Sequence, residues 1–418
     1  MKQIIISGGN LLTGTINIGG AKNSAVALVP ASLLSDEKVT ISNIPKISDI
    51  EALTEILEYL GADISLENDV IKIDSSSVEN KEIPENVSKK LRASYYFMSA
   101  LLGKYKHVEM YFPGGCAIGA RPIDQTLKGF RALGATVIEE NNKFKIFADE
   151  LKGAHVYLDM PSVGATINTM LVAVRATGGT IIENAAREPE IVSVANFLNS
   201  MGARITGAGT SKIKIIGVEK MTSGFSEVIP DRIEAGTYII AGAVMGHNLT
   251  VANIIPEHIE NLIQKLKEMG VPITVDSTSV TVSRANSLKP ISVRTAGYPG
   301  FPTDLQQPLT VLLSMAEGVS KLEETIYENR FQNVKYLNKM GADIDVSSQR
   351  VIKIKGPTKY KGGTVMATDL RAGACMIIAA LTTNKKTFID KAEHILRGYE
   401  NIEDKLKNVG VNIEIVDI

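Results

Sequence analysis

One short pattern recurs six times along the chain: an apolar residue, a glycine, and then alanine or valine. The interval from one glycine to the next is always between 68 and 73 residues. Self-similarity at a nearly constant period is typical of a fold assembled from repeated structural units. We therefore expect six copies of one supersecondary unit. The copies are Leu60-Gly61-Ala62, Leu133-Gly134-Ala135, Met201-Gly202-Ala203, Met269-Gly270-Val271, Met340-Gly341-Ala342 and Val409-Gly410-Val411.

Each of these glycines is expected to end an amphipathic helix. In all six copies the residues one and four positions before the glycine are apolar, as Leu57 and Leu60 are before Gly61. That spacing places both side chains on one face of an α-helix. The glycine suits the position just after the helix, where a positive φ costs it little. The alternating residues that follow, such as 62–66 and 70–73, predict a pair of strands.

A second, more apolar helix is predicted before each amphipathic helix, with a strand between the two. Because these segments are apolar on all sides, their helices are expected to be buried. The predicted unit is a buried helix, a strand, an amphipathic helix and a strand pair. This order indicates an α/β (α+β) fold with helices inside and sheets outside. The six buried segments span 24–34, 92–102, 165–174, 235–245, 309–315 and 372–381.

Six units divide most simply into two groups of three. A single hydrophobic core stops growing beyond roughly 250–300 residues, and this chain has 418. The best candidate for the boundary is 219–230, which contains the turn-forming stretch Thr222-Ser223-Gly224. The alternative is an open solenoid, which would show more even spacing and no break at its midpoint.

The composition excludes several classes of partner. Lys+Arg number 45 against 46 Asp+Glu, and there is no Trp, so neither a basic nor a base-stacking surface for nucleic acid is expected. The apolar stretches are too short for a membrane span, and the apolar run at the N-terminus is too short for a signal peptide. Two cysteines do not make a disulfide framework. We therefore expect a cytoplasmic protein with reduced thiols.

The second repeat has the longest interval, and its extra residues lie between its strand and its amphipathic helix. The sequence there is Pro113-Gly114-Gly115-Cys116-Ala117-Ile118-Gly119-Ala120-Arg121-Pro122, which predicts a flexible surface loop. A partly exposed thiol near a cation is the setting of reactive cysteine chemistry. On position alone, Cys116 could equally be an unreactive small residue. Cys375 falls in a buried helix and is expected to belong to the core.

Charged residues mark the starts of the predicted buried helices. Asp231, Asp304 and Asp369 could simply be capping or first-turn acids. Capping does not explain Lys22 and Arg92, because a cation at a helix N-terminus opposes the helix dipole. A bound anion between the cation and the helix end would remove that conflict. If equivalent helices point the same way, these ends converge on one cleft that suits phosphate, carboxylate and hydroxyl groups.

Other motifs carry little information. The five histidines are scattered without metal-ligand spacing. The paired glycines at 8–9, 19–20 and 362–363 match neither the dinucleotide fingerprint nor a P-loop. These motifs therefore predict neither a metal site nor a dinucleotide-binding or P-loop site.

At these residues the chain resembles the UDP-N-acetylglucosamine 1-carboxyvinyltransferase family of enolpyruvyl transferases. The resemblance covers essentially the full length and rests on an ordered series of motifs. The motifs are Gly19-Gly20-Ala21-Lys22-Asn23, Leu91-Arg92-Ala93-Ser94, the loop 113–124, Ser162-Val163-Gly164-Ala165-Thr166, Glu183-Asn184-Ala185-Ala186-Arg187-Glu188-Pro189-Glu190, Phe301-Pro302-Thr303-Asp304, Thr368-Asp369-Leu370-Arg371 and Arg397-Gly398-Tyr399-Glu400.

The resemblance implies a two-domain inverse α/β barrel. Each domain would contain three repeats of a βαβαββ-type unit, with helices inside and sheets outside. The first domain would cover 21–229 and carry the Cys116 loop, and the second would combine 1–20 with 230–418. The active site would lie in the cleft between the two domains.

The resemblance also implies transfer of the enolpyruvyl group of phosphoenolpyruvate to the 3′-hydroxyl of UDP-N-acetylglucosamine, without a cofactor. Cys116 matches the proton donor to phosphoenolpyruvate, and Asp304 matches the base for the sugar hydroxyl. The implied catalytic residues are Cys116, Asp304, Lys22 and Arg397; phosphoenolpyruvate would contact Lys22, Asn23, Arg121, Arg397 and Cys116. UDP-N-acetylglucosamine would contact Asn23, Arg92, Arg121, Pro122, Ile123, Asp124, Gln125, Ser162, Val163, Gly164, Asp304 and Ile326, and Asp369 and Arg371 would support the site.

Two positions depart from the pattern of some family members. Met160-Pro161 precedes Ser162 where a basic residue can occur, and Gln125 stands where others carry an aliphatic residue. Both concern the uridine end of the nucleotide sugar. They bear on affinity rather than on the class of reaction.

Three alternatives remain open from the sequence. The sister enolpyruvyl transferase that uses shikimate 3-phosphate shares the architecture, but Gly115-Cys116 and the run 121–124 argue against it. A non-catalytic paralogue that binds the nucleotide sugar would not need the four implied catalytic residues, and a structural repeat protein would not need charged helix starts. The sequence predicts no nucleic-acid or membrane partner and does not define an oligomeric state.

Overall fold

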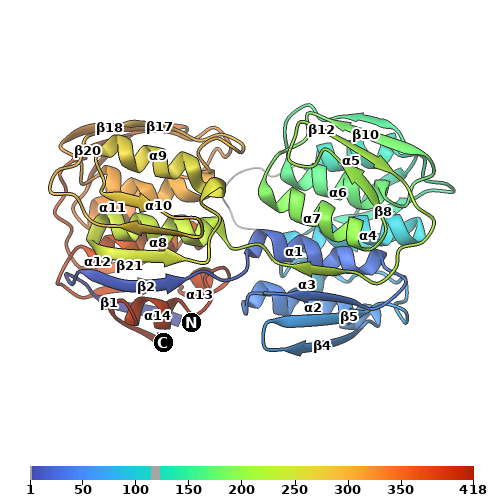
Figure 1. Cartoon of the computed structure of the whole chain (residues 1–418), viewed down its shortest axis with the longest axis horizontal. Helices are drawn as coiled ribbons and strands as arrows, with labels where there is room; N and C mark the ends of the chain where they lie inside the picture. Colours follow the sequence, from blue (N-terminus) through green and yellow to red (C-terminus); the bar gives the residue numbers. More distant parts are fainter. Residues whose placement is uncertain (1, 114–122) are drawn as a thin grey trace. The chain divides into compact units, whose positions relative to one another are not determined.

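The computed structural model describes residues 2–113 and 123–418. The described residues form two compact units (Figure 1). The N-terminal unit contains residues 20–113 and 123–229, and the C-terminal unit contains residues 2–19 and 230–418. The chain therefore passes from one unit to the other near residues 19–20 and again near 229–230.

The N-terminal unit contains the first three repeats. The first comprises α1 (Lys22–Ala31), the 3-10 helix η1 (Ser32–Leu34), β3 (Val39–Ser42), α2 (Ser48–Leu60), β4 (Asp63–Glu67) and β5 (Val70–Asp74). The second comprises α3 (Glu85–Ser88), η2 (Arg92–Ser94), α4 (Tyr95–Tyr105), β6 (His107–Tyr111), α5 (Asp124–Ala132), β7 (Thr136–Glu140) and β8 (Lys143–Phe147). The third comprises β9 (His155–Tyr157), α6 (Val163–Ala173), β10 (Gly179–Glu183), α7 (Pro189–Ser200), β11 (Arg204–Thr206) and β12 (Lys212–Ile216), and β13 (Phe225–Glu227) follows it.

The C-terminal unit repeats the same order of elements after two N-terminal strands, β1 (Lys2–Ser7) and β2 (Leu12–Asn17). The fourth repeat comprises α8 (Arg232–Met245), β14 (Gly246–Ala252), η3 (Pro256–Ile259), α9 (Glu260–Met269), β15 (Ile273–Val275) and β16 (Ser279–Val282). The fifth comprises β17 (Ser292–Arg294), α10 (Thr303–Leu313), β18 (Gly318–Glu323), α11 (Val334–Lys339), β19 (Asp343–Ser348) and β20 (Val351–Gly356). The sixth comprises β21 (Gly363–Met366), α12 (Leu370–Leu381), β22 (Thr387–Asp390), α13 (Glu393–Leu396), α14 (Ile402–Lys407) and β23 (Asn412–Asp417).

The apolar helices form the centre of each unit, and strands surround them (Figure 1). In α8 every residue after Arg232 is buried, and in α12 every residue after Leu370 is buried. Each unit has its own hydrophobic core, and the two cores share no residue. The predicted α/β class, with helices inside and sheets outside, is therefore confirmed.

The six repeated glycines adopt the backbone that their pattern predicts. The residues one and four positions before each glycine are at most 2% exposed, so they anchor the amphipathic helices to the core. Positive φ after a helix lets the chain reverse into the next strand, and only glycine reaches that region freely. The φ angles of Gly61, Gly134, Gly202, Gly270, Gly341 and Gly410 lie between 89° and 108°.

The sheets show that some repeats are completed by strands from distant parts of the chain. The third repeat is continuous, with strand order β11-β12-β10-β9. The first repeat instead receives its parallel edge strand from β13, and the fourth receives its own from β2. In the sixth repeat β1 occupies the place of the missing inner strand, between β22 and β23. These three strands therefore tie together segments that lie far apart in the sequence.

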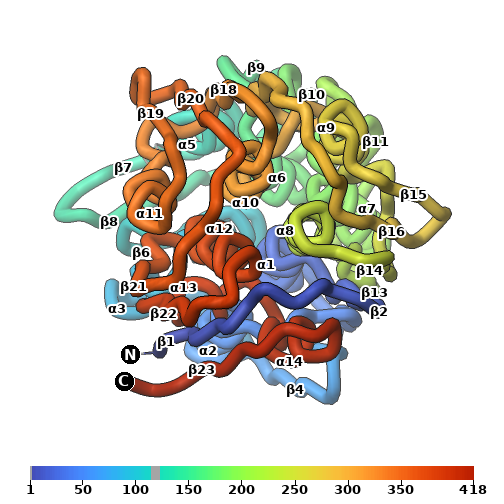
Figure 2. Tube along the Cα trace, turned by 90° about the vertical axis from the view of Figure 1, so that its left-hand side faces the viewer, coloured from blue at the N-terminus to red at the C-terminus, as the bar shows by residue number. Residues whose placement is uncertain are grey.

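The pairing of β1 brings the two ends of the described chain together. Residues Lys2 to Ser7 pair antiparallel with β23, and Lys2 lies opposite Asp417 (Figure 2). The other edge of β1 pairs antiparallel with β22. The N-terminal strand β1 thus completes a sheet whose other strands, β21, β22 and β23, come from the last repeat of the chain.

The start of α10 corrects the predicted helix at 309–315. The helix begins at Thr303 and ends at Leu313, with Pro308 inside it. The start at Thr303 agrees with the charged helix start expected at Asp304, but the apolar stretch covered only the later part of the helix because Gln306 and Gln307 interrupt it. Both glutamines are nevertheless completely buried, and each donates a side-chain hydrogen bond to the carbonyl oxygen of Arg330.

Two repeats cover an open sheet edge with an asparagine side chain. The Asn199 amide donates to the Ile205 carbonyl oxygen at 3.0 Å and accepts from the Ile205 N–H at 2.8 Å. Asn338 makes the same two bonds to Ile344 in the fifth repeat, at 2.9 and 3.1 Å. The amide thus replaces a neighbouring strand at β11 and β19, both of which are edge strands.

Candidate active site

Asp304 lies in the first turn of α10, where it accepts hydrogen bonds from two arginines. Arg330 Nη2 is 2.7 Å from Asp304 Oδ1, and Arg371 Nη2 is 3.3 Å from Asp304 Oδ2. Both arginine side chains are at least 96% buried, whereas 25% of the Asp304 side chain is exposed. The two guanidinium groups therefore fix a carboxylate that still reaches solvent.

Each arginine is in turn held by further buried groups. Arg371 Nη1 donates to the Tyr399 hydroxyl at 3.0 Å, and this hydroxyl lies 2.9 Å from Thr237 Oγ1. Asp369 caps α12 by accepting the backbone N–H of Arg371 at 2.9 Å. Asp369 and Arg371 were predicted to support the site. In the structure Arg371 contacts Asp304, and Asp369 accepts the backbone N–H of Arg371.

The pKa of Asp304 records the balance between burial and charge. Burial alone would raise it, but the guanidinium groups of Arg371 and Arg330 outweigh burial and hold the pKa of Asp304 well below its ordinary value. Asp304 is therefore ionised throughout the neutral pH range. Such a carboxylate can accept a hydrogen bond from a hydroxyl group, and it holds a transferred proton only weakly.

Arg397 follows the short helix α13 in the same unit. It is half-buried, and it stands three residues after His394. Burial lowers the pKa of His394, Glu393 opposes that shift, and Arg397 adds to it. A neutral imidazole therefore accompanies the arginine, and Arg397 and Lys391 carry the positive charge near it. Ile326 lies on the loop after β18, and its backbone N–H donates to Glu324 Oε1 at 2.8 Å.

Lys22 is the first residue of α1 in the N-terminal unit, and Asn23 follows it in the same turn. Lys22 Nζ lies 2.5 Å from Asp49 Oδ2, and the Asp49 side chain is 4% exposed. Asp49 belongs to the first turn of α2. The Asp49 carboxylate thus offsets the unfavourable interaction between the Lys22 cation and the dipole of α1. Sequence analysis missed Asp49 because an acid in a first turn also fits simple helix capping.

Tyr95 links two of the segments that were expected to touch the nucleotide sugar. The Arg92 guanidinium lies over its ring, with 5.7 Å between Cζ and the ring centroid. A Cβ at Gly164 would lie 2.0 Å from the Tyr95 hydroxyl oxygen, so the Tyr95 side chain would have to shift to admit any larger residue there. Ser162 caps α6 by accepting the Ala165 N–H at 3.3 Å, with Val163 as the next residue of the helix. The structure therefore brings Arg92 close to the start of α6.

Gln125 is held in place by the segment that precedes Ser162. Its Nε2 donates to Asp159 Oδ2 at 3.1 Å and to Asp124 Oδ2 at 2.9 Å, and its Oε1 accepts the Asp159 N–H at 2.9 Å. Lys128 and Gln125 lower the pKa of the Asp159 carboxyl. Ile123 is half-buried just before α5. No sequence pattern marks Asp159, because an exposed acid in a loop has no periodicity.

Three expected site residues, Cys116, Arg121 and Pro122, lie outside the described residues. The remaining ones fall into two sets. Lys22, Asn23, Arg92, Ile123, Asp124, Gln125, Ser162, Val163 and Gly164 belong to the N-terminal unit, and Asp304, Ile326, Asp369, Arg371 and Arg397 belong to the C-terminal unit. Sequence analysis missed Arg330, Glu324 and Tyr399, whose side chains complete the second set.

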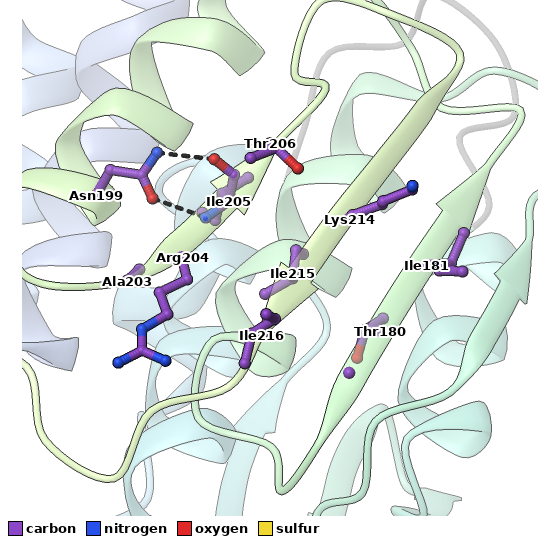
Figure 3. A pocket seen from close by; sticks show the side chains of 11 residues that line it. Thr180, Ile181, Asn199, Ala203, Arg204, Ile205, Thr206, Lys214, Ile215 and Ile216 are labelled. Carbon is purple, nitrogen blue, oxygen red and sulfur yellow. Dashed lines mark hydrogen bonds between the residues drawn. The ribbon is translucent and has the colours of Figure 1, made fainter.

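A separate hollow of about 560 Å³ lies on the sheet of the third repeat (Figure 3). Strands β10, β11 and β12 line it, with Arg204 and Lys214 as its charged groups. None of the expected site residues contributes to it, and its described lining contains no carboxylate. In Figure 3 the amide of Asn199 is directed to Ile205, so that polar group is already engaged. We do not assign this hollow to the candidate active site.

The described residues contain no group of three or more His, Cys, Asp or Glu side chains that could hold a metal ion. Over the same part of the chain, no helix is both long and apolar enough to cross a membrane.

Comparison with known proteins defines the class. A family model described as EPSP synthase (3-phosphoshikimate 1-carboxyvinyltransferase) matches residues 6–406. The chain therefore belongs to this family of enolpyruvyl transferases. The enolpyruvyl transferase NikO from Streptomyces tendae has the same fold, with a TM-score of 0.90 at 25% identity over 99% of both chains. EPSP synthase from Acinetobacter baumannii aligns over the whole of both chains with a TM-score of 0.74 at 18% identity.

Within the family, the chain is most informatively compared with proteins of higher identity. It is 50% identical to UDP-N-acetylglucosamine 1-carboxyvinyltransferase 2 of Bacillus subtilis (strain 168), over 99% of this chain and 96% of the relative. It is 49% identical to the protein of the same name from Listeria monocytogenes serotype 4b (strain F2365), over 98% of this chain and 97% of the relative. The resemblance seen in the motifs is thus confirmed.

Proposed function

We propose that this protein transfers the enolpyruvyl group of phosphoenolpyruvate to the 3′-hydroxyl of UDP-N-acetylglucosamine and releases phosphate. The observation that carries the proposal is 50% identity, over 99% of the chain, to a relative named for this reaction. The 18% identity to an EPSP synthase is much lower, which favours the nucleotide sugar over shikimate 3-phosphate as the acceptor.

The chemistry requires one proton to be added at a carbon and one to be removed from a hydroxyl. The sugar oxygen bonds to C2 of phosphoenolpyruvate while C3 gains a proton, which gives a tetrahedral ketal. Loss of a C3 proton and of phosphate then yields the enolpyruvyl ether. We assign the proton transfer at C3 to Cys116 and the acceptance of the hydroxyl proton to Asp304.

The electrostatics of Asp304 support a role during bond formation. Because its pKa lies well below the ordinary value, Asp304 would orient the 3′-hydroxyl as a hydrogen-bond acceptor before the reaction. The hydroxyl becomes far more acidic only as its oxygen bonds to carbon, and the proton would move to Asp304 at that stage. Arg330 and Arg371 would fix the direction of the accepting oxygens.

The cations of the site match the two anionic groups of phosphoenolpyruvate. We assign Lys22, Arg121 and Arg397 to its phosphate and carboxylate, and Asn23 to a position beside Lys22. We assign the nucleotide sugar to Asn23, Arg92, 121–125 and 162–164 of the first set and to Asp304 and Ile326 of the second. No metal or organic cofactor takes part in this proposal.

We place this reaction in the cytoplasm, as the first committed step of peptidoglycan synthesis. Both proposed substrates are charged and phosphorylated, and they do not cross a membrane unaided. A cytoplasmic location would give the protein direct access to both.

The test is the release of phosphate from phosphoenolpyruvate with UDP-N-acetylglucosamine as acceptor, run in parallel with shikimate 3-phosphate. We expect turnover only with the nucleotide sugar. Turnover with shikimate 3-phosphate would replace the acceptor in the proposal. A folded protein that releases phosphate with neither acceptor would contradict the assignment as an enzyme.

A non-catalytic protein that binds the nucleotide sugar is separated from a catalyst by changing Cys116. A catalyst with Cys116→Ser should lose turnover while binding UDP-N-acetylglucosamine with unchanged affinity, measured by calorimetry. Cys375→Ala is the matched control, because Cys375 is completely buried in α12 and, among the described residues, accepts a hydrogen bond only from Asn333, at 3.5 Å. Its turnover should stay within about twofold of the parent enzyme, apart from any loss of folded protein.

A further inference from the structure

Glu324 is a completely buried carboxylate that lies behind Asp304 and was not expected from the sequence. Its Oε1 accepts from the backbone N–H groups of Ile326 and Tyr327, at 2.8 and 3.1 Å, and from Thr295 Oγ1 at 3.1 Å. Its Oε2 accepts from Thr303 Oγ1 at 2.7 Å. Burying a carboxylate is costly unless its oxygens are hydrogen-bonded, and here four donors reach it.

The hydroxyl of Thr303 connects this carboxylate to Arg330. A hydroxyl carries one proton, and Thr303 donates that proton to Glu324. Its oxygen can therefore act only as an acceptor toward other groups, and Arg330 Nη1 donates to it at 3.0 Å. Because Glu324 fixes the direction of the hydroxyl, it also fixes which face of the hydroxyl the guanidinium meets.

The rest of Arg330 is fixed as well. Its Cζ lies 5.1 Å from the centroid of the Tyr327 ring, and its carbonyl oxygen accepts from Gln306 and Gln307. With Nη1 held by Thr303, Nη2 is directed at Asp304 Oδ1, 2.7 Å away. The side chain thus has a single orientation in which both of its terminal nitrogens are bonded.

We propose that Glu324 and Thr303 are positioning residues, which orient Arg330 against Asp304 while Glu324 also fixes the backbone of Ile326. The inference rests on the proposed function, in which Asp304 faces the acceptor hydroxyl and Ile326 contacts the nucleotide sugar. One buried carboxylate then sets both the orientation of the reacting group and the position of a loop that contacts the same substrate.

The first test changes Thr303 to valine, which has the same shape and no hydroxyl. Arg330 then loses its anchor at Nη1, and we expect kcat to fall about 10- to 100-fold, as for loss of a hydrogen bond to a charged group. Weaker pairing with Arg330 raises the pKa of Asp304, so the acid limb of the pH profile of kcat should move to higher pH. Thr303→Ser keeps the hydroxyl and should restore both quantities to within about threefold.

Thr310→Val is the matched control in the same helix. Thr310 is also completely buried, but within the described part of the chain its hydroxyl bonds only to the Gln306 carbonyl oxygen, to which it donates at 2.8 Å. It should lower stability without moving the acid limb. An equal shift in Thr310→Val, or no shift in Thr303→Val, would overturn the proposal.

The second test changes Glu324 to glutamine. The amide nitrogen cannot accept the proton of Thr303, so the Thr303 hydroxyl must rotate. The hydrogen bond from the Ile326 N–H also weakens, because a neutral amide oxygen is a poorer acceptor than a carboxylate oxygen. We expect a lower kcat and a KM for UDP-N-acetylglucosamine raised about threefold or more, with little change in the KM for phosphoenolpyruvate. Equal changes in both KM values would indicate general disruption of the fold and contradict a positioning role.

A measurement without substrate separates this inference from the proposed function. The pKa of Asp304 is followed by NMR titration of carboxyl-labelled protein in the parent, Thr303→Val and Thr310→Val forms. If the pKa of Asp304 rises in Thr303→Val but not in Thr310→Val, the positioning of Arg330 by Thr303 is supported, even if no turnover with UDP-N-acetylglucosamine is found. If the parent turns over but the pKa of Asp304 is unchanged in Thr303→Val, the positioning of Arg330 by Thr303 is rejected and the proposed function stands.

Discussion

The pairing of Asp304 with two buried arginines predicts a large effect of removing Arg330. In Arg330→Met the carboxylate loses its closer partner, at 2.7 Å, and keeps Arg371 at 3.3 Å. Loss of one adjacent opposite charge should raise the pKa of Asp304 by about one to three units, which corresponds to about 1.4–4 kcal/mol. Removal of one member of a buried ion pair costs about 3–5 kcal/mol in total, because the charge that remains is uncompensated.

The sign of the pH dependence follows from the depressed pKa. A carboxyl group whose pKa is lower in the folded state than in the unfolded chain adds stability above its unfolded pKa and loses it as the pH falls through the folded value. In the parent protein, Asp304 should therefore contribute fully down to the ordinary carboxyl range and lose its contribution only below it. In Arg330→Met the loss should begin at the same unfolded-state pKa, but it should be smaller and should be complete at a higher pH, because the folded-state pKa of Asp304 is less depressed.

Urea denaturation from pH 7 down to about pH 2 measures both effects. Arg294→Met is the control, because Arg294 is 72% exposed and lies 3.5 Å from Glu323 on the surface of the same unit. That variant should cost about 0–1 kcal/mol with no change in the acid range. If Arg330→Met followed the same pH profile as the parent, the interaction between Arg330 and Asp304 would not be the cause of the low pKa.

Three further predictions concern groups away from Asp304. Burial raises the pKa of Glu234 to about 7 although Lys405 lies 2.7 Å away, so the folded state keeps a proton that the unfolded chain loses. Stability should therefore fall by about 3 kcal/mol as the pH rises from about 4.5 to about 7, and Glu234→Gln should abolish this slope in urea denaturation. Asn199→Ala removes both hydrogen bonds that cover strand β11, so it should cost about 1–2 kcal/mol and cause concentration-dependent association in light scattering; a monomer of unchanged stability would show that the edge is protected in another way. Gly270→Ala should cost about 1–2 kcal/mol through its positive φ alone, because a Cβ there has its nearest neighbour at 4.0 Å. Gly61→Ala should cost more, since its Cβ would meet a carbonyl oxygen at 2.9 Å, and thermal unfolding that ranks the two variants the other way would contradict this reasoning.

The repeated architecture could be predicted because it depends on local patterns. The apolar spacing before each glycine and the positive φ at the glycine are both properties of a few adjacent residues. The strands that complete other repeats are different, because β1, β2 and β13 lie far in sequence from the sheets that they join. A short strand can pair with any open edge of suitable register, so its pattern alone does not identify its partner.

The candidate site was predictable to the extent that its residues belong to motifs. Lys22 and Asp304 stand at helix starts, where their charge attracts attention. Glu324 and Arg330 lie in a loop without periodicity, and their importance comes from burial and from hydrogen bonds across about 20–30 positions of sequence. Only the packed structure shows that their charges are removed from water and directed at Asp304.

The three acidic helix starts of the C-terminal unit resolve an ambiguity that the sequence left open. Asp231 caps α8 and Asp369 caps α12, each by accepting two backbone N–H groups, so capping is the correct account of both. Asp304 lies one position inside its helix, whose cap residue is Pro302. Its oxygens are therefore not used for the backbone and face Arg330 and Arg371 instead. Asp304, which does not cap its helix, is the acid that the family resemblance implies in catalysis. Because it lies two positions after the cap residue, its carboxylate is available for chemistry.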